Sequence, residues 1–228
     1  MVTTSWDDGH QLDLRLADLL RANGLPGTFY VAPRNREFRQ HDLLTEPQVR
    51  ELATEFEVGS HTITHPRLSS VPPSEAVQEI RDSKSLLEDI TGKAVVSFCY
   101  PGGDYRQEHV QMVSDAGYGY ARTVRRYAFD IASPYQAPTS LHAYDHYSDL
   151  WPMLRFARYQ PGRFIGYRHW DRLACDMFDR VVESGGVYHL WGHSWEIDRT
   201  GSWSRLENVL GYIGGRANVT YAVNGALT

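Results

Sequence analysis

Two adjacent carboxylates, Asp7 and Asp8, stand where a short β-rich run, residues 2–6, meets Gly9. Side chains alternate between faces along a strand, so both acids can serve one site only if the chain leaves strand geometry there. Gly9 permits such a turn. Neighbouring carboxylates also repel each other unless a cation or a hydrogen-bond network offsets the repulsion. The pair therefore predicts a reactive site that contains a cation.

A second pair of reactive residues, His61 and His65, has the spacing of side chains on one side of a helical turn. With one carboxylate from another strand they make a three-ligand set with open positions, which is typical of a catalytic metal centre. We therefore expect one divalent ion, with Zn²⁺ as the first choice and other transition metals as alternatives. The remaining acid is then free as a general base, and His193, after an apolar strand, is a candidate general acid.

The segments around these residues alternate between strand and helix patterns. Strands are expected at residues 2–6, 27–32, 57–60, 94–100, 118–124, 162–167, 187–191 and 219–223. Helices are expected at residues 12–20, 45–56, 74–90, near 110–113, and at 173–182 and 206–213, with long loops and one short helix across 125–161. Such alternation predicts an α/β fold, a distorted parallel barrel of seven or eight β/α units in a single domain, residues 1–228.

A parallel barrel gathers reactive residues at the carboxyl ends of its strands. The two aspartates, His61, residues 101–103 and His193 all fall at such ends. His189 lies on the same face of its strand as His193 and is the alternative acid. We favour His193 because it lies nearer the carboxyl end, and Glu196 is either its orienting partner or a solvated acid.

These stretches resemble the NodB-homology polysaccharide deacetylases, carbohydrate esterase family 4. Residues 4–9, Thr-Ser-Trp-Asp-Asp-Gly, resemble the family's Thr-Phe-Asp-Asp-Gly motif, and residues 61–65, His-Thr-Ile-Thr-His, resemble its His-Ser/Thr-x-x-His motif. In that family the first Asp is the base, the second Asp and both histidines bind the metal, and a later histidine is the acid. The resemblance therefore implies that Asp7 is the base, that Asp8, His61 and His65 bind the metal, and that His193 is the acid.

Residues 98–103, Phe-Cys-Tyr-Pro-Gly-Gly, resemble the family's third motif, in which the amide after the proline binds the oxyanion. The resemblance implies that the Gly102 amide has this role and that Tyr100 lies beside the substrate. In the final motif Trp191 stands where a smaller apolar residue often lines the acetyl pocket. We find no counterpart of the fourth motif, an Asp-rich stretch with a tryptophan.

The family's arginine in the third motif is missing, and Cys99 stands at about its place. In the family that arginine holds the catalytic Asp. Arg122, toward the carboxyl end of the next expected strand, is long enough to reach a neighbouring strand's mouth. We expect its planar guanidinium to grip the Asp7 carboxylate in two places.

The predicted function is therefore metal-dependent removal of an N-acetyl group from an amino sugar or an acetylated glycan. A similar site could also hydrolyse a cyclic amide, a formamide or an O-acetyl ester, and an inactive carbohydrate-binding homologue is a further alternative. A non-haem iron oxygenase is disfavoured, because such enzymes usually place an acid two residues after the first histidine, where this chain has Ile63.

The composition limits the classes of partner that the protein is expected to bind. A net charge of -5 and a pI near 6.0 argue against nucleic acid or an anionic membrane surface. Cys99 and Cys175 are expected to be reduced. No leader or long apolar run is visible, so a protein starting natively at Met1 is expected to be cytoplasmic, without membrane insertion. The oligomeric state is left open.

Two further hypotheses, with weaker support, concern a cluster of polar residues and a set of tryptophans. His142, Asp145 and His146 could hold a second metal, although a loop rich in proline and tyrosine also presents such residues to water. Four tryptophans could form a sugar platform, with at least half of them expected in the core: Trp6, Trp151, Trp170 and Trp195.

Overall fold

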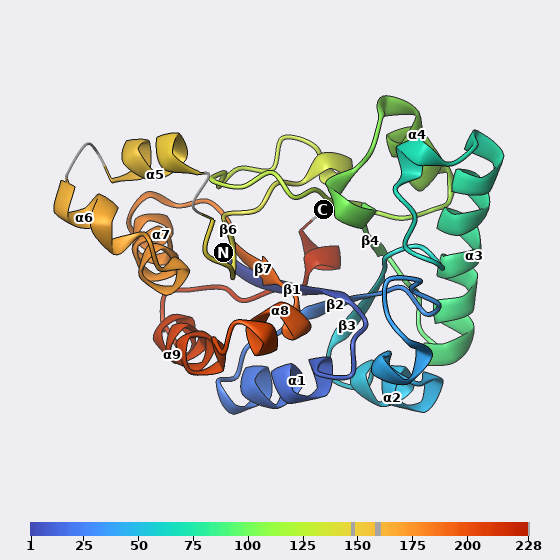
Figure 1. The fold of residues 1–228 in the computed structure, drawn as a ribbon, viewed down its shortest axis with the longest axis horizontal. Coiled ribbons are helices and arrows are strands. Elements are labelled where there is room, and N and C mark those ends of the chain that lie inside the picture. Colours follow the sequence, from blue (N-terminus) through green and yellow to red (C-terminus); the bar gives the residue numbers. More distant parts are fainter. Residues whose placement is uncertain (147–148, 158–160, 228) are drawn as a thin grey trace.

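A curled sheet of seven parallel strands forms the centre of the protein (Figure 1). The computed structural model describes residues 1–146, 149–157 and 161–227. The strands are β1 (Val2–Asp8), β2 (Thr28–Val31), β3 (Glu57–Ser60), β4 (Ser97–Cys99), β5 (Tyr120–Arg122), β6 (Leu141–His142) and β7 (Tyr188–Gly192). Their order across the sheet is β5-β4-β3-β2-β1-β7-β6. The strand with the two aspartates therefore lies inside the sheet, between β2 and β7.

Helices connect the strands and pack on the outside of the sheet (Figure 1). They are α1 (Asp13–Ala22), α2 (Glu46–Leu52), α3 (Pro73–Thr91), α4 (Gln107–Asp115), α5 (Leu150–Phe156), α6 (Pro161–Gly166), α7 (Trp170–Ser184), α8 (Ser194–Arg199) and α9 (Trp203–Ile213). In α3, for example, Ala76, Ile80 and Leu87 recur at helical spacing and are fully buried. The alternation of patterns thus correctly predicts a parallel α/β fold. In the described ranges, no helix combines the length and apolarity needed to cross a bilayer.

The structure differs from the expected elements in several places. Residues 162–166 of the segment expected as a strand, 162–167, belong to helix α6, because a short apolar run does not distinguish the two by periodicity. The segment 219–223, expected as a final strand, makes only a bridge between Tyr221 and Val2. Strand β6, inside the expected long loop, was not predicted, since its two residues are too few to show a pattern.

Candidate metal centre and active site

Strand β1 ends in two buried carboxylates, Asp7 and Asp8, each 2% exposed. The backbone φ of Asp8 is 85° and that of Gly9 is 70°, so the chain leaves extended geometry at the second acid. Both carboxylates therefore line one cavity at the carboxyl end of the sheet. A Cβ on residue 9 would lie 2.9 Å from Cγ1 of Val31, so space as well as conformation requires glycine.

Asp8, His61 and His65 converge in this cavity. Oδ1 of Asp8 lies 3.8 Å from Nε2 of His61 and 3.4 Å from Nε2 of His65. Ligands at about 2.0–2.2 Å from a tetrahedral zinc ion would lie roughly 3.4 Å apart, so little adjustment is needed. Oδ1 of Asp8 is also buried without a hydrogen-bond partner in the described structure. The three side chains therefore fit one divalent ion, which they would bind through two nitrogens and one oxygen.

The protonation of His61 suits a metal ligand. Its Nδ1 lies 2.7 Å from the carbonyl oxygen of Cys99, and a carbonyl only accepts, so Nδ1 carries the proton. Nε2 then presents its lone pair toward Asp8 and His65. Burial, together with the neighbouring His65, lowers the pKa of His61 to about 4, which keeps the ring neutral near pH 7.

The two histidines lie on a loop, residues 61–65, and the expected helical turn is wrong. Thr62 and His65 have positive φ values of 65° and 61°. Glu79 on helix α3 accepts hydrogen bonds from the amides of residues 63 and 64, at 2.8 and 2.9 Å. A buried carboxylate thus replaces the carbonyl partners of a helix, and the loop bends so that both rings reach Asp8.

Arg122 binds the carboxylate of Asp7, which is the contact expected from the sequence. Nη2 of Arg122 contacts both carboxylate oxygens, so one nitrogen bridges them where a two-nitrogen fork was expected. Arg122 lies in register with Cys99 on the neighbouring strand, and both members of the ion pair are buried. Burial alone would raise the pKa of Asp7, but the guanidinium and two nearby imidazoles lower it to about 2. Asp7 is therefore ionised at neutral pH.

His193 lies opposite the two aspartates and has its own carboxylate partner. Nδ1 of His193 is 2.6 Å from Oε2 of Glu196, and its Nε2 is 3.9 Å from Oδ2 of Asp8. His142 Nε2 lies 3.0 Å from the same Glu196 oxygen, and its Nδ1 lies 2.7 Å from His146. Burial alone would lower the pKa of His193, but Glu196 and the aspartates raise it to about 9. His193 therefore carries a proton at neutral pH.

His189, the alternative acid, is a core residue. It is 1% exposed, and its Nε2 lies 2.8 Å from Oγ of Ser5 on strand β1. Burial lowers the pKa of His189 well below its usual value, so the ring is neutral. The cavity that holds both aspartates is lined by His193 and not by His189.

The third motif forms a tight turn, Pro101–Gly103, beside the metal ligands. Gly102 has a φ of 58° and lines the cavity, so its backbone is accessible to a substrate. Tyr100 also lines the cavity, although its hydroxyl donates to the carbonyl oxygen of Tyr135 at 3.0 Å. Trp191, expected at the acetyl pocket, is a buried wall of the same cavity. Its ring stacks on His142 with centroids 4.0 Å apart.

The cavity has a volume of about 320 Å³, and its lining includes four residues that were not predicted: Glu37, Arg67, Val124 and Arg126. Trp195, predicted only as part of a sugar platform, donates through Nε1 to Oδ2 of Asp8 at 2.8 Å, and Oε1 of Glu37 lies 3.2 Å from Nδ1 of His65. The place of Trp195 two residues after His193 could have indicated that it lies at the site. Glu37 follows strand β2 in an irregular loop and has no comparable signal.

The residues of the two weaker hypotheses, a second metal site and a sugar platform, do not come together in the structure. Asp145 accepts from the amide of Trp170 at 2.8 Å and from Arg205 at 3.2 Å, so it does not join His142 and His146. Of the four candidate platform tryptophans, Trp6 and Trp170 are core residues and Trp195 lines the cavity, while Trp151 is 76% exposed. These four rings therefore do not make one platform.

A sequence model of the family described as polysaccharide deacetylase matches residues 1–121, which include both aspartates, both histidines and the third motif. The chain belongs to the polysaccharide deacetylase family. YxkH of Bacillus subtilis (strain 168), which is assigned to the same deacetylases, is 29% identical over 119 residues. That match covers 51% of this chain and 42% of YxkH, so the chain corresponds to less than half of this relative.

Solved deacetylase structures share the fold. One from Mycobacterium smegmatis covers 99% of this chain and 87% of its own, with a TM-score of 0.68 and 14% identity. The Streptococcus pyogenes deacetylase PplD, solved with acetate, covers 60% of this chain and 62% of its own, with a TM-score of 0.56 and 21% identity. BA3943 of Bacillus anthracis, described as a family pseudoenzyme, covers 93% and 58%, with a TM-score of 0.54 and 16% identity. At these identities the structures support the NodB-like fold.

Proposed function

We propose that the protein is a metal-dependent hydrolase that removes an N-acetyl group from an amino sugar of an acetylated glycan. The observation that carries the proposal is the meeting of three kinds of group in one cavity. Asp8, His61 and His65 form a ligand set for one ion. Asp7 is an ionised base, and His193 is a protonated acid. Family membership supports the same reaction class.

The proposed catalytic domain spans residues 1–228. The family match ends at residue 121. Beyond it, Arg122 contacts Asp7, and Nε2 of His193 lies 3.9 Å from Oδ2 of Asp8. Strand β7 pairs with β1 along its length and carries His193 just beyond its end. The two halves of the site therefore require one continuous sheet.

Asp8, His61 and His65 would hold the divalent ion, with Zn²⁺ the first choice. When bound, the ion supplies a Lewis acid that polarises the amide carbonyl and acidifies a water molecule. Asp7, kept ionised by Arg122, accepts the proton of the attacking water. The Gly102 amide donates a hydrogen bond to the oxygen that becomes negatively charged. His193, oriented through Nδ1 by Glu196, donates its Nε2 proton to the departing amine.

The test is acetate release by protein stripped of metal and reloaded with Zn²⁺, using N-acetylglucosamine oligomers as substrates. A cyclic amide, a formamide and an O-acetyl ester serve as comparison substrates. We expect Asp8→Ala to lose both bound zinc and turnover. Asp7→Asn should keep zinc and lose about 10²–10⁴-fold in turnover, because a base moves only a proton.

Two results would contradict the proposal. Near wild-type turnover in Asp7→Asn would remove the base from the mechanism. Tight glycan binding by zinc-loaded protein without any acetate release would place the chain with inactive homologues such as BA3943.

A further inference from the structure

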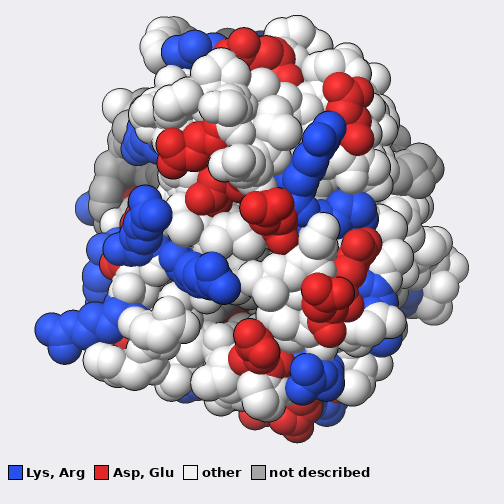
Figure 2. Space-filling model, turned by 90° about the vertical axis from the view of Figure 1, so that its right-hand side faces the viewer, with Lys and Arg blue, Asp and Glu red and all other residues white. Residues whose placement is uncertain are grey.

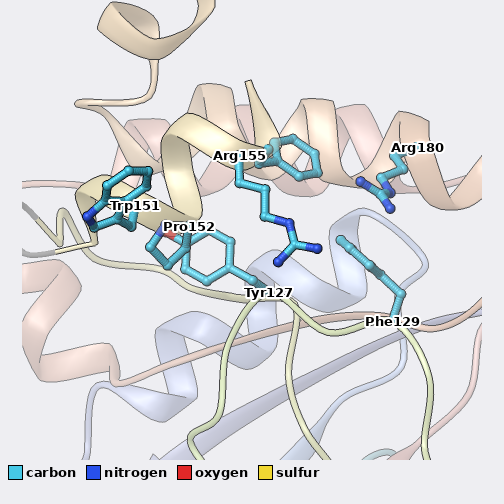
Figure 3. A pocket seen from close by; sticks show the side chains of 7 residues that line it. Tyr127, Phe129, Trp151, Pro152, Arg155 and Arg180 are labelled. Carbon is cyan, nitrogen blue, oxygen red and sulfur yellow. The ribbon is translucent and has the colours of Figure 1, made fainter. Parts of the chain in front are cut away.

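A second cavity, of about 890 Å³, has none of the proposed metal ligands among its lining residues (Figure 3). We call it the arginine groove. It is lined by Tyr127, Phe129, Trp151, Pro152, Arg155, Phe156 and Arg180. Aromatic faces thus surround two guanidinium groups, and none of the described residues that line the groove is acidic.

Both arginines of the groove are free to bind an anion. In the described part of the chain neither guanidinium forms an ion pair, and the residues outside it include no Asp or Glu. Cζ of Arg180 lies 5.1 Å from the ring centroid of Phe129 and 5.6 Å from that of Phe156. Arg155 extends from α5 into the groove between Tyr127 and Phe129 (Figure 3).

This arrangement differs from that on another face of the protein, whose net charge is -5. On the face seen in Figure 2, basic and acidic side chains are interspersed. In the arginine groove two positive groups lie together, and the lining residues that the structure describes include no carboxylate. The field of the groove therefore favours an anionic ligand.

The groove adjoins the active cavity through one segment. Arg126 lines the active cavity, and the next residue, Tyr127, lines the arginine groove. The guanidinium of Arg126 forms two hydrogen bonds of 2.9 Å with Asp149, the residue that precedes α5. Since α5 carries Trp151 and Arg155, this ion pair joins the walls of the two cavities. The two cavities therefore lie on neighbouring parts of the chain, as a site for a ligand of several sugar units requires.

We infer that the arginine groove binds an acidic sugar of the glycan, so that the substrate class is an anionic, N-acetylated polysaccharide. This inference rests on the proposed function. The guanidinium fork matches a carboxylate or a phosphate, whereas a neutral sugar would leave both cations without a counter-charge. The negative faces of Tyr127, Phe129 and Trp151 suit the weakly positive C–H groups of a sugar ring.

The test measures binding in the Asp7→Asn variant, so that turnover does not consume the ligand. Trp151, which is 76% exposed at the groove, reports binding through its fluorescence, and calorimetry gives an independent value. The probes are an oligomer of alternating N-acetylglucosamine and glucuronic acid, an N-acetylglucosamine oligomer of equal length, and that oligomer carrying a 6-phosphate. An acidic peptide tests whether the site recognises charge alone.

We expect the better of the two anionic oligomers to bind about tenfold more tightly than the neutral one, and which of them does so identifies the anion as carboxylate or phosphate. Arg155→Ala and Arg180→Ala should each weaken this binding about tenfold, because each removes a charge-assisted contact. Arg81→Ala is the matched control, since it removes one exposed positive charge from α3, outside both cavities. Binding to the groove should also weaken with added salt.

Equal affinity for neutral and anionic oligomers would overturn the inference, as would an equal loss in Arg81→Ala. Equally tight binding of the acidic peptide would overturn the assignment to a sugar. The proposed function fails separately, through absence of acetate release in the wild-type protein. Arginine-dependent binding without acetate release would keep the groove as an acidic-sugar site and refute the hydrolase.

Discussion

The protonation state of Asp7 depends on a single buried guanidinium. Nη2 of Arg122 contacts both oxygens of the carboxylate, and the pKa of Asp7 is lowered to about 2 although burial alone would raise it. A buried carboxylate without a cation resists ionisation. Arg122 therefore controls the ionisation of Asp7, the proposed base, although it is not among the residues that line the cavity.

We predict that Arg122→Ala lowers turnover and moves the acidic limb of the pH–rate profile to higher pH. The base must be ionised, and loss of the cation raises the pKa of Asp7, so activity is lost at a higher pH as the solution is acidified. Zinc content should not change. Arg122→Lys, which keeps the charge, is the control for folding and should shift the limb less. Normal turnover with an unmoved acidic limb would refute this role.

The opposite shift is expected for the acid. Glu196, together with Asp8 and Asp7, raises the pKa of His193 to about 9, so Glu196→Gln should lower that pKa and move the alkaline limb to lower pH. The shift has this sign because the acid must be protonated, and a His193 with a lower pKa loses its proton at a lower pH. Kinetics across pH, with zinc analysis, check the result. Glu207→Gln, an exposed acid on α9, is the control, and an alkaline limb that stays in place would exclude Glu196.

At the scale of elements, helix α3 positions the loop that carries two of the proposed metal ligands, His61 and His65, without carrying one itself. Glu79 accepts the amides of residues 63 and 64 and the hydroxyl of Thr64, the last at 2.7 Å. These bonds hold the bend that presents His65 to Asp8. Mutation of residues that orient metal ligands typically costs about 10–100-fold in metal affinity.

We therefore predict that Glu79→Gln lowers zinc affinity about 10–100-fold, because a neutral amide accepts hydrogen bonds more weakly than a carboxylate and has one acceptor oxygen in place of two. Competition with a chelator measures the affinity. Glu75→Gln changes an exposed acid on the same helix and should have no effect. Unaltered zinc affinity in Glu79→Gln would show that the 61–65 loop is ordered by its other contacts.

At the scale of the whole molecule, the end of the chain closes the amino-terminal side of the sheet. Asn224 is fully buried, and its Oδ1 accepts from the hydroxyl of Thr3 at 2.8 Å. Its Nδ2 donates to the hydroxyl of Tyr30 at 2.9 Å, and its backbone amide donates to Thr28 at 2.9 Å. The last residues thus join two strands at the end opposite the active cavity.

We predict that Asn224→Ala lowers the free energy of unfolding by about 3 kcal/mol, because two buried hydroxyls lose their partner. Turnover per folded molecule should not change, since this end of a parallel barrel serves stability and the other end carries the chemistry. Urea denaturation and acetate release measure the two quantities. Asn218→Ala, at an exposed position, is the control, and equal stability of the two variants would contradict the prediction.

The sequence by itself determined the parallel α/β fold and the place of the reactive residues at strand ends. Both follow from local information. Strand and helix patterns are visible within a few residues, and parallel strands bring their carboxyl ends to one edge. Asp7, Asp8 and His61 were therefore predictable neighbours, and the register of adjacent strands made Arg122 a candidate partner of Asp7.

The tertiary structure alone decided the features that depend on packing between distant segments. The bend at residues 61–65 forms because Glu79 replaces helical carbonyls, and α6 is helical where its apolar run allowed either state. The link from Glu196 to His142 joins residues 54 positions apart, and the arginine groove joins α5, α7 and residues 127–129. No local pattern contains such contacts, because they exist only once the helices have packed on the sheet.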